Sequence, residues 1–148
     1  MSKPFELVVD HGAPFPSRLA SCWYGWVNRH ISPAYFVSEE RGCVRYSAMY
    51  LVANRRVLYP EMRQVIQRED VHRPWRFAKL DHLLADAASV NEVNVLYPIA
   101  ALGQSARIFS DQYYACSYLG GDRPSVGVQQ TSLCWFERTR FLVVRPAV

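Results

Sequence analysis

The sequence predicts a single α+β domain, with helices mainly in the first half and an antiparallel β-sheet mainly in the second half. Its 148 residues suit one domain with its own core, so we expect one domain over residues 1–148. Half of the residues are hydrophobic and 20% are charged, which excludes an intrinsically disordered chain. Helix-type spacing dominates up to about residue 90, and valine-rich and aromatic segments dominate after it.

The first forty residues predict a strand, a loop and a helix. Phe5–Val9 is an apolar run of strand length, and the glycine and prolines of residues 11–16 break it off into a loop. Ser17 is an expected N-cap for a helix that runs to about His30. Ala34–Val37 is a short strand-like run. The apolar residues of the predicted helix recur on one helical face: Leu19, Trp23, Trp26 and Val27.

Three more helices are expected before residue 90. Ser38 and the two glutamates after it are typical of a helix start, because the helix dipole favours negative charge there. We expect the apolar side of this helix to hold Val44, Ala48, Leu51 and Val52. Pro60 opens a short helix with Met62, Val65 and Ile66 on one face. The clearest helical spacing covers Trp75–Ser89, through Phe77, Leu80, Leu83, Leu84, Ala87 and Ala88.

The last third predicts an antiparallel sheet. Its segments are rich in valine and aromatic residues, which strands favour. A Gly-Gly-Asp-Arg-Pro-Ser sequence at residues 120–125 is a hairpin turn between two of these strands. The predicted strands are Glu92–Tyr97, Ala106–Ser110, Gln112–Leu119, Val126–Gln130, Leu133–Phe136 and Arg140–Arg145.

The excess positive charge lies in one segment. The net charge is +4, and the basic residues are fifteen arginines and two lysines. Asn54–Lys79 carries seven basic and three acidic side chains, which accounts for the whole excess. Such a segment attracts an acidic protein surface or nucleic acid, although a solvated helix face has the same composition. The candidate partner-binding residues are Arg55, Arg56, Arg63, Arg68, Arg73 and Arg76.

Several classes of protein are excluded or disfavoured by what the sequence lacks. The four cysteines form no C-x-x-C pair, and no histidine stands at metal-ligand spacing from them, so we expect no metal site. No phosphate-binding glycine loop, serine nucleophile elbow or zinc-binding histidine helix is present. No apolar run is long enough for a membrane span, and the start has no secretory signal pattern, which predicts a cytoplasmic protein.

The first fifty residues contain the most specific pattern. A strand ends in His11-Gly12, and Ala34-Tyr35-Phe36-Val37-Ser38 follows before a segment with Arg45-Tyr46-Ser47-Ala48. This order resembles the front half of the ADP-ribosyltransferase superfamily, in the branch with a His, Tyr and acid-or-amide site. The resemblance covers about a third of the chain, and Ala13 stands where that family often has threonine.

The resemblance implies that the chain uses NAD as a substrate. His11 would hold the ribose on the adenosine side, Gly12 would let the backbone approach the dinucleotide, and Tyr35 would stack on the nicotinamide. A late acid or amide would orient the second ribose while nicotinamide leaves. Gln129, Gln130 and Glu137 all stand at suitable positions, and the sequence does not choose among them.

Two functions therefore follow from the sequence. The first is an ADP-ribosyltransferase-like effector or toxin that modifies a macromolecule with NAD. The alternative is a non-enzymatic inhibitor, adaptor or assembly component that engages an acidic partner through residues 54–79. The sequence leaves open whether the chain is an enzyme, and whether it forms oligomers.

Overall fold

The computed structural model describes residues 3–22, 24–67, 74–89, 98–120, 123–130 and 134–147. It forms one mixed β-sheet and three helices, and the helices all lie within the first 89 residues. The helices are α1 (Phe15–Ala20), α2 (Tyr59–Gln67) and α3 (Leu80–Ser89). The strands are β1 (Phe5–Asp10), β2 (Trp26–Val27), β3 (Cys43–Val52), β4 (Arg76–Phe77), β5 (Ile99–Ile108), β6 (Asp111–Gly120), β7 (Arg123–Gln130) and β8 (Arg140–Pro146).

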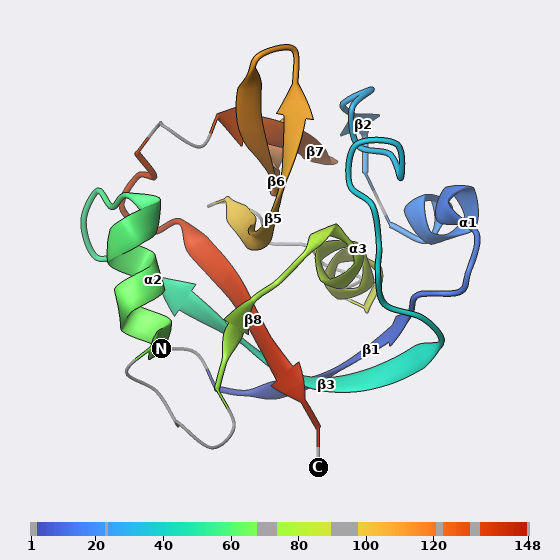
Figure 1. Ribbon diagram of the computed structural model, residues 1–148, viewed down its shortest axis with the longest axis horizontal. Helices are drawn as coiled ribbons and strands as arrows, with labels where there is room; N and C mark the ends of the chain where they lie inside the picture. Colours follow the sequence, from blue (N-terminus) through green and yellow to red (C-terminus); the bar gives the residue numbers. More distant parts are fainter. Residues whose placement is uncertain are drawn as a thin grey trace.

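The sheet has the order β1-β3-β8-β5-β6-β7-β2, and β4 also pairs with β8. Most neighbours are antiparallel, as expected, but β5 pairs with β8 and β2 pairs with β7 in parallel. The sheet is therefore mixed, and its central strands come from both halves of the chain. Helix α3 lies near the middle of the molecule and contacts β1, β5 and β6, whereas α1 and α2 lie toward opposite sides (Figure 1).

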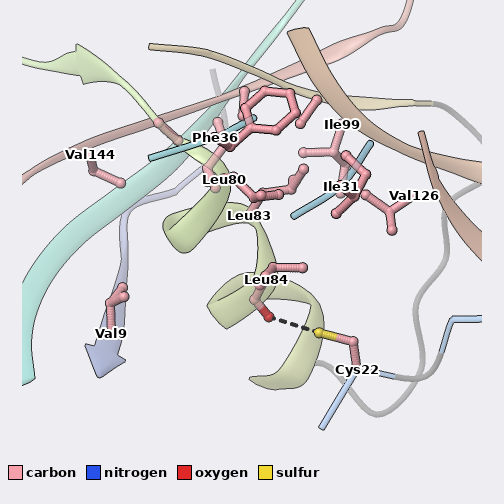
Figure 2. Packing of buried hydrophobic residues seen from close by; sticks show 14 of the residues in the cluster. Val9, Cys22, Ile31, Phe36, Leu80, Leu83, Leu84, Ile99, Val126 and Val144 are labelled. Carbon is pink, nitrogen blue, oxygen red and sulfur yellow. Dashed lines mark hydrogen bonds between the residues drawn. The ribbon is translucent and has the colours of Figure 1, made fainter. Parts of the chain in front are cut away.

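Two apolar clusters make up the core, and adjacent residues of β3 enter different clusters. Tyr46 and Ala48 belong to the cluster that contains the leucines of α3. Met49 and Leu51 belong to the second cluster, which contains Met62 and Ile66 of α2. In Figure 2, Leu80, Leu83 and Leu84 of α3 pack among Phe36, Ile31, Ile99 and Val126, and the Cys22 thiol donates to the Leu84 carbonyl.

Helices α2 and α3 begin with the same arrangement. In each helix, the side chain of the third residue accepts a hydrogen bond from the backbone N–H of the residue that precedes the helix. Glu61 accepts from Leu58 in α2, at 3.2 Å, and His82 accepts from Lys79 in α3, at 2.9 Å. The helix predicted to open at Pro60 is therefore confirmed, although Val65 is exposed while Met62 and Ile66 are buried.

Several predicted elements of the first half are wrong. The helix expected over Ser17–His30 ends at Ala20, because Gly25 and Asn28 donate backbone hydrogen bonds to Pro124 and Val126 of β7. Residues 33–35 form a turn in place of a strand, closed by Phe36 N–H on the Ser32 carbonyl. The helix expected after Ser38 is absent: residues 38–42 are neither helix nor strand, and β3 follows them.

The remaining predictions differ in smaller ways. The helix expected over Trp75–Ser89 begins at Leu80, because Arg76 and Phe77 pair with β8 as β4. The expected strand Glu92–Tyr97 lies outside the described residues. In the expected strand Leu133–Phe136, the described part contributes a single bridge between Trp135 and Val57. The strands predicted over Phe5–Val9, 112–119, 126–130 and 140–145 are confirmed with shifted ends. The strand predicted over 106–110 covers only the last three residues of β5, which begins at Ile99.

Asp86 of α3 gives the fold a predictable pH dependence. The Tyr50 hydroxyl donates to its carboxylate at 2.7 Å. Burial, the largest cause, raises the pKa of Asp86, although the Tyr50 hydrogen bond and the Arg140 charge oppose this. Because the pKa of Asp86 is higher in the folded than in the unfolded protein, the protonated carboxyl group favours the folded state. This contribution to stability is complete below the unfolded-state pKa, and it is lost as the pH rises through the folded-state pKa.

We therefore expect Asp86→Asn to gain stability relative to the wild type as pH rises from about 4 to about 7. Urea unfolding of both proteins at several pH values measures this difference. Asp111→Asn is the matched control, because it removes the carboxylate of an exposed residue. A constant difference between Asp86→Asn and wild type across this range would contradict the raised pKa.

Candidate functional site

The Asp81 carboxylate, at the start of α3, gathers three segments that are distant in sequence. The Ser38 hydroxyl donates to it at 2.5 Å, and Arg18 of α1 donates through Nη1 at 2.5 Å. His11 lies directly after β1, and its Nδ1 is 2.7 Å from Asp81 Oδ2. Because an ionised carboxylate only accepts hydrogen bonds, Nδ1 of His11 carries a proton.

The second nitrogen of His11 faces Tyr46 of β3 and Glu40. His11 Nε2 lies 2.9 Å from the Tyr46 hydroxyl and 3.3 Å from Glu40 Oε2. The Tyr46 hydroxyl is also 3.2 Å from the same Glu40 oxygen. The side chain of His11 has no solvent-exposed area, so both of its nitrogens interact inside the protein.

His82 completes the cluster from α3. Its Nδ1 accepts the Lys79 N–H, and its Nε2 lies 3.6 Å from Glu40 Oε2, which is too far for a hydrogen bond. Burial is the largest cause that lowers the pKa of His82, to about 4, so the ring is neutral at pH 7. With Nδ1 as an acceptor, the proton is on Nε2, and this nitrogen lacks a hydrogen-bond partner among the described residues.

Arginines bind the outer oxygens of the two carboxylates. Arg76 of β4 donates to Glu40 Oε1 at 2.5 Å, as Arg18 does to Asp81 Oδ1. Burial alone would raise the pKa of Glu40, but Arg76 and then His82 and His11 bring it below its ordinary value. The pKa of Asp81 is lowered as well, because hydrogen bonds from Ser38, His11 and Arg18 outweigh burial. Both carboxyl groups are therefore ionised near neutral pH.

These residues form a connected chain of polar side chains, which we call the His11 network: Arg18, Asp81, His11, Tyr46, Glu40, His82 and Arg76. Its two ends reach two different pockets. Arg18 and Asp81 line a pocket of about 380 Å³ between β1, α1 and α3, and Asp10 and Ala13 also line it. Arg76 lines a second pocket of about 290 Å³ beside α2.

The side chains of the His11 network are of the types used in general-base catalysis and in metal binding. A histidine held by a carboxylate at one nitrogen is the usual arrangement of a general base, but the buried ring of His11 touches protein groups only. Alternatively, His11, Glu40 and His82 each offer one ligand atom, and these atoms lie within 4.8 Å of one another. Such a group can hold a metal ion, although the sequence predicted no metal site.

The residues that the resemblance groups together have different local contacts in the structure. Tyr35 packs its ring edge-on against His30, with ring centroids 5.0 Å apart, and the described residues show no contact between Tyr35 and His11. The Gly12 N–H donates to Asp10. Gln129 lies on β7 and donates to the Cys134 carbonyl, and Glu137 is exposed in the turn before β8. Their roles toward NAD stay predictions.

The candidate arginines also have different environments. Arg55 forms an ion pair with Glu61, and Arg76 binds Glu40 in the network. The Arg56 guanidinium lies 5.2 Å above the centre of the Phe136 ring. Arg63 is exposed on α2. The remaining two, Arg68 and Arg73, lie outside the described residues.

Sequence reasoning singled out His11 but missed Asp81, Glu40 and His82 as its partners. The separation of 70 residues between His11 and Asp81 leaves no spacing signal. The sequence does contain one signal. Asp81 and His82 lie between Leu80 and Leu83, which belong to the apolar face of the predicted helix, and polar residues are uncommon in such a position. A polar pair in that place indicates a buried hydrogen-bonded cluster.

Comparison of the chain with protein families, with curated proteins and with solved structures finds no match. Among the described residues, no helix is both long and apolar enough to cross a membrane.

We expect Asp81→Asn to lower the free energy of unfolding by about 3 kcal/mol or more. The amide cannot accept from Ser38, His11 and Arg18 together, and its NH₂ group faces one of these donors. Chemical denaturation measures the loss. Glu39→Gln, which removes an exposed carboxylate nearby, should change stability by less than about 0.5 kcal/mol. Equal losses in the two variants would show that the network does not anchor the fold.

Proposed function

We propose that the chain is a binding protein that engages an acidic protein partner through the surface around α2. This surface, which we call the α2 face, combines exposed apolar and arginine side chains: Val52, Arg55, Arg56, Leu58, Val65 and Phe136. The other large apolar side chains that are exposed among the described residues lie on different segments: Val8, Trp26, Tyr35, Val37 and Phe109.

The stacked pair of Arg56 and Phe136 carries the proposal. Phe136 is 60% exposed, and Arg56, whose guanidinium lies above its ring, is exposed as well. The bridge between Val57 and Trp135 holds the two segments together beneath this pair. Arginine and aromatic side chains on a rigid support are the residues that dominate the energetics of protein interfaces.

A pocket is lined by Arg55 and Val57, the two sequence neighbours of Arg56. Val52, Arg55 and Val65 line it, with a volume of about 250 Å³. An apolar side chain of a partner can fill it, while acidic groups around that side chain meet the arginines. Phosphate backbones make little use of exposed valine and leucine, so this composition favours a protein over nucleic acid.

We expect Arg56→Glu and Phe136→Ser each to abolish retention of the partner, and increasing salt to weaken it. The measurement is capture from lysate on the immobilised chain, followed by titration of the captured protein after purification. Phe109→Asn is the control, because Phe109 is 86% exposed on another part of the surface and has a φ of 57°, which asparagine tolerates.

Retention that survives both α2-face substitutions would overturn the proposal. Retention that disappears after nuclease treatment would assign the face to nucleic acid.

One observation favours the NAD-using transferase as a second candidate. The pocket of about 380 Å³ borders the turn at His11-Gly12, because Asp10 and Ala13 line it. A pocket of that volume is within the range of small-molecule sites. We infer that NAD, if it binds, binds there, and that its ribose reaches the polar groups of Arg18 and Asp81.

The test is nicotinamide release and label transfer from NAD with purified protein, with and without lysate. If the transferase proposal is right, His11→Asn and Tyr35→Ala both abolish turnover, because alanine removes the aromatic face at position 35. Asparagine at position 11 can still donate to Asp81, which keeps the variant folded. No turnover by the folded wild-type protein would exclude this candidate and would leave the α2 face as the functional surface.

A further inference from the structure

We propose that His11, Glu40 and His82 form a buried site for one divalent transition-metal ion of the zinc type. His11 Nε2 and His82 Nε2 lie 3.3 Å and 3.6 Å from Glu40 Oε2. Ligands about 2.0–2.2 Å from a metal ion stand at such separations from one another, so small shifts bring all three into contact with one ion. Two imidazoles and one carboxylate are a donor set that Zn²⁺ and similar ions favour.

The surroundings of the cluster orient its ligand atoms. Asp81 accepts the Nδ1 proton of His11, which fixes the ring with Nε2 toward Glu40. Metal-ligating histidines are commonly held in this way by a carboxylate on the other nitrogen. Arg76 binds Oε1 of Glu40 and leaves Oε2 directed inward. The Tyr46 hydroxyl lies beside both ligands and can act as a neighbouring oxygen donor.

His82 provides an independent observation. Its side chain has no exposed area, and its Nε2 is a buried polar atom without a hydrogen-bond partner among the described residues. Native proteins rarely leave such atoms unsatisfied, and this one is directed at the Glu40 carboxylate. A metal ion between these groups would give the nitrogen a partner.

Binding requires one proton to move within the His82 ring. Without metal the proton is on Nε2, because Nδ1 accepts the Lys79 N–H. When Nε2 coordinates, the ring keeps its proton on Nδ1 and the Lys79 hydrogen bond is lost. The ring stays neutral, so the step neither releases nor takes up a proton. Its Nδ1–H then faces the Lys79 N–H, and because both groups are donors, the ring must also turn away from Lys79.

The burial of the ligands indicates a structural ion. Both histidine side chains are completely buried and Glu40 is 22% exposed, so little room remains for a substrate. The ion would join the end of β1, the 38–40 segment and α3. An ion that binds only the folded chain raises its stability by mass action.

The experiment uses the full chain after chelator treatment and dialysis, titrated with Co²⁺ and with Zn²⁺. We expect one ion per chain by calorimetry, a visible Co²⁺ absorption band typical of a nitrogen and oxygen site, and a higher thermal midpoint with Zn²⁺. His82→Asn should abolish all three, because the asparagine oxygen can replace Nδ1 as the acceptor for Lys79 but cannot replace Nε2.

Two controls separate this site from adventitious binding. His30→Asn and Cys43→Ser remove a histidine and an exposed thiol elsewhere, and both should bind one ion as the wild type does. If His82→Asn does not fold, Glu40→Gln provides the same test, because it keeps the shape of the side chain and removes its charge. Absence of stoichiometric uptake by the wild type, or uptake that His82→Asn or Glu40→Gln leaves unchanged, overturns the proposal.

Discussion

The buried carboxylate of Asp81 is the constraint on which the arrangement of the first half depends. Its partners are Ser38, His11 and Arg18, which come from a loop, a strand end and a short helix. An ionised group in the core is costly unless each oxygen accepts good hydrogen bonds. These three segments must therefore reach the start of α3 together, and β1 and α1 take their positions around it. The same carboxylate then sets the tautomer of His11.

The strand prediction succeeded for β8 but failed for β3, although both strands lie inside the sheet. The buried residues of β8, Phe141-Leu142-Val143-Val144, form one continuous apolar run of strand length. Strand β3 lies between β1 and β8 and contacts an apolar cluster on each face, so its apolar residues lose the period of two. Val44, Ala48, Leu51 and Val52 then match helical spacing by chance. Only the neighbouring strands, which are remote in sequence, decide between the two structures.

The candidate site was harder to predict than the fold, because its members meet only in the folded chain. His11 could be singled out because it follows a strand and precedes a glycine. The family resemblance implied that its ring binds a ribose of NAD. In the structure the His11 ring contacts Asp81, Tyr46 and Glu40. Glu40, which looked like an ordinary helix-start residue, and Asp81, which lay inside a predicted helix, each form an ion pair with an arginine. The spacing of residues along the sequence does not show which carboxylate will pair with which arginine.

The charge balance of the network bears on what it can accept. Two ionised carboxylates face two arginines, and His82 is neutral at pH 7. A dication would add positive charge at the centre, but the side chain of Arg76 is 46% exposed, so water screens much of its charge. Arg18 is more enclosed and keeps Asp81 ionised. The buried centre therefore contains the Oε2 atom of an ionised carboxylate, Glu40, which accepts a hydrogen bond from the neutral Tyr46 hydroxyl. A cation is the ligand that such a feature attracts, whereas the acidic partner proposed for the α2 face would meet arginines at the surface.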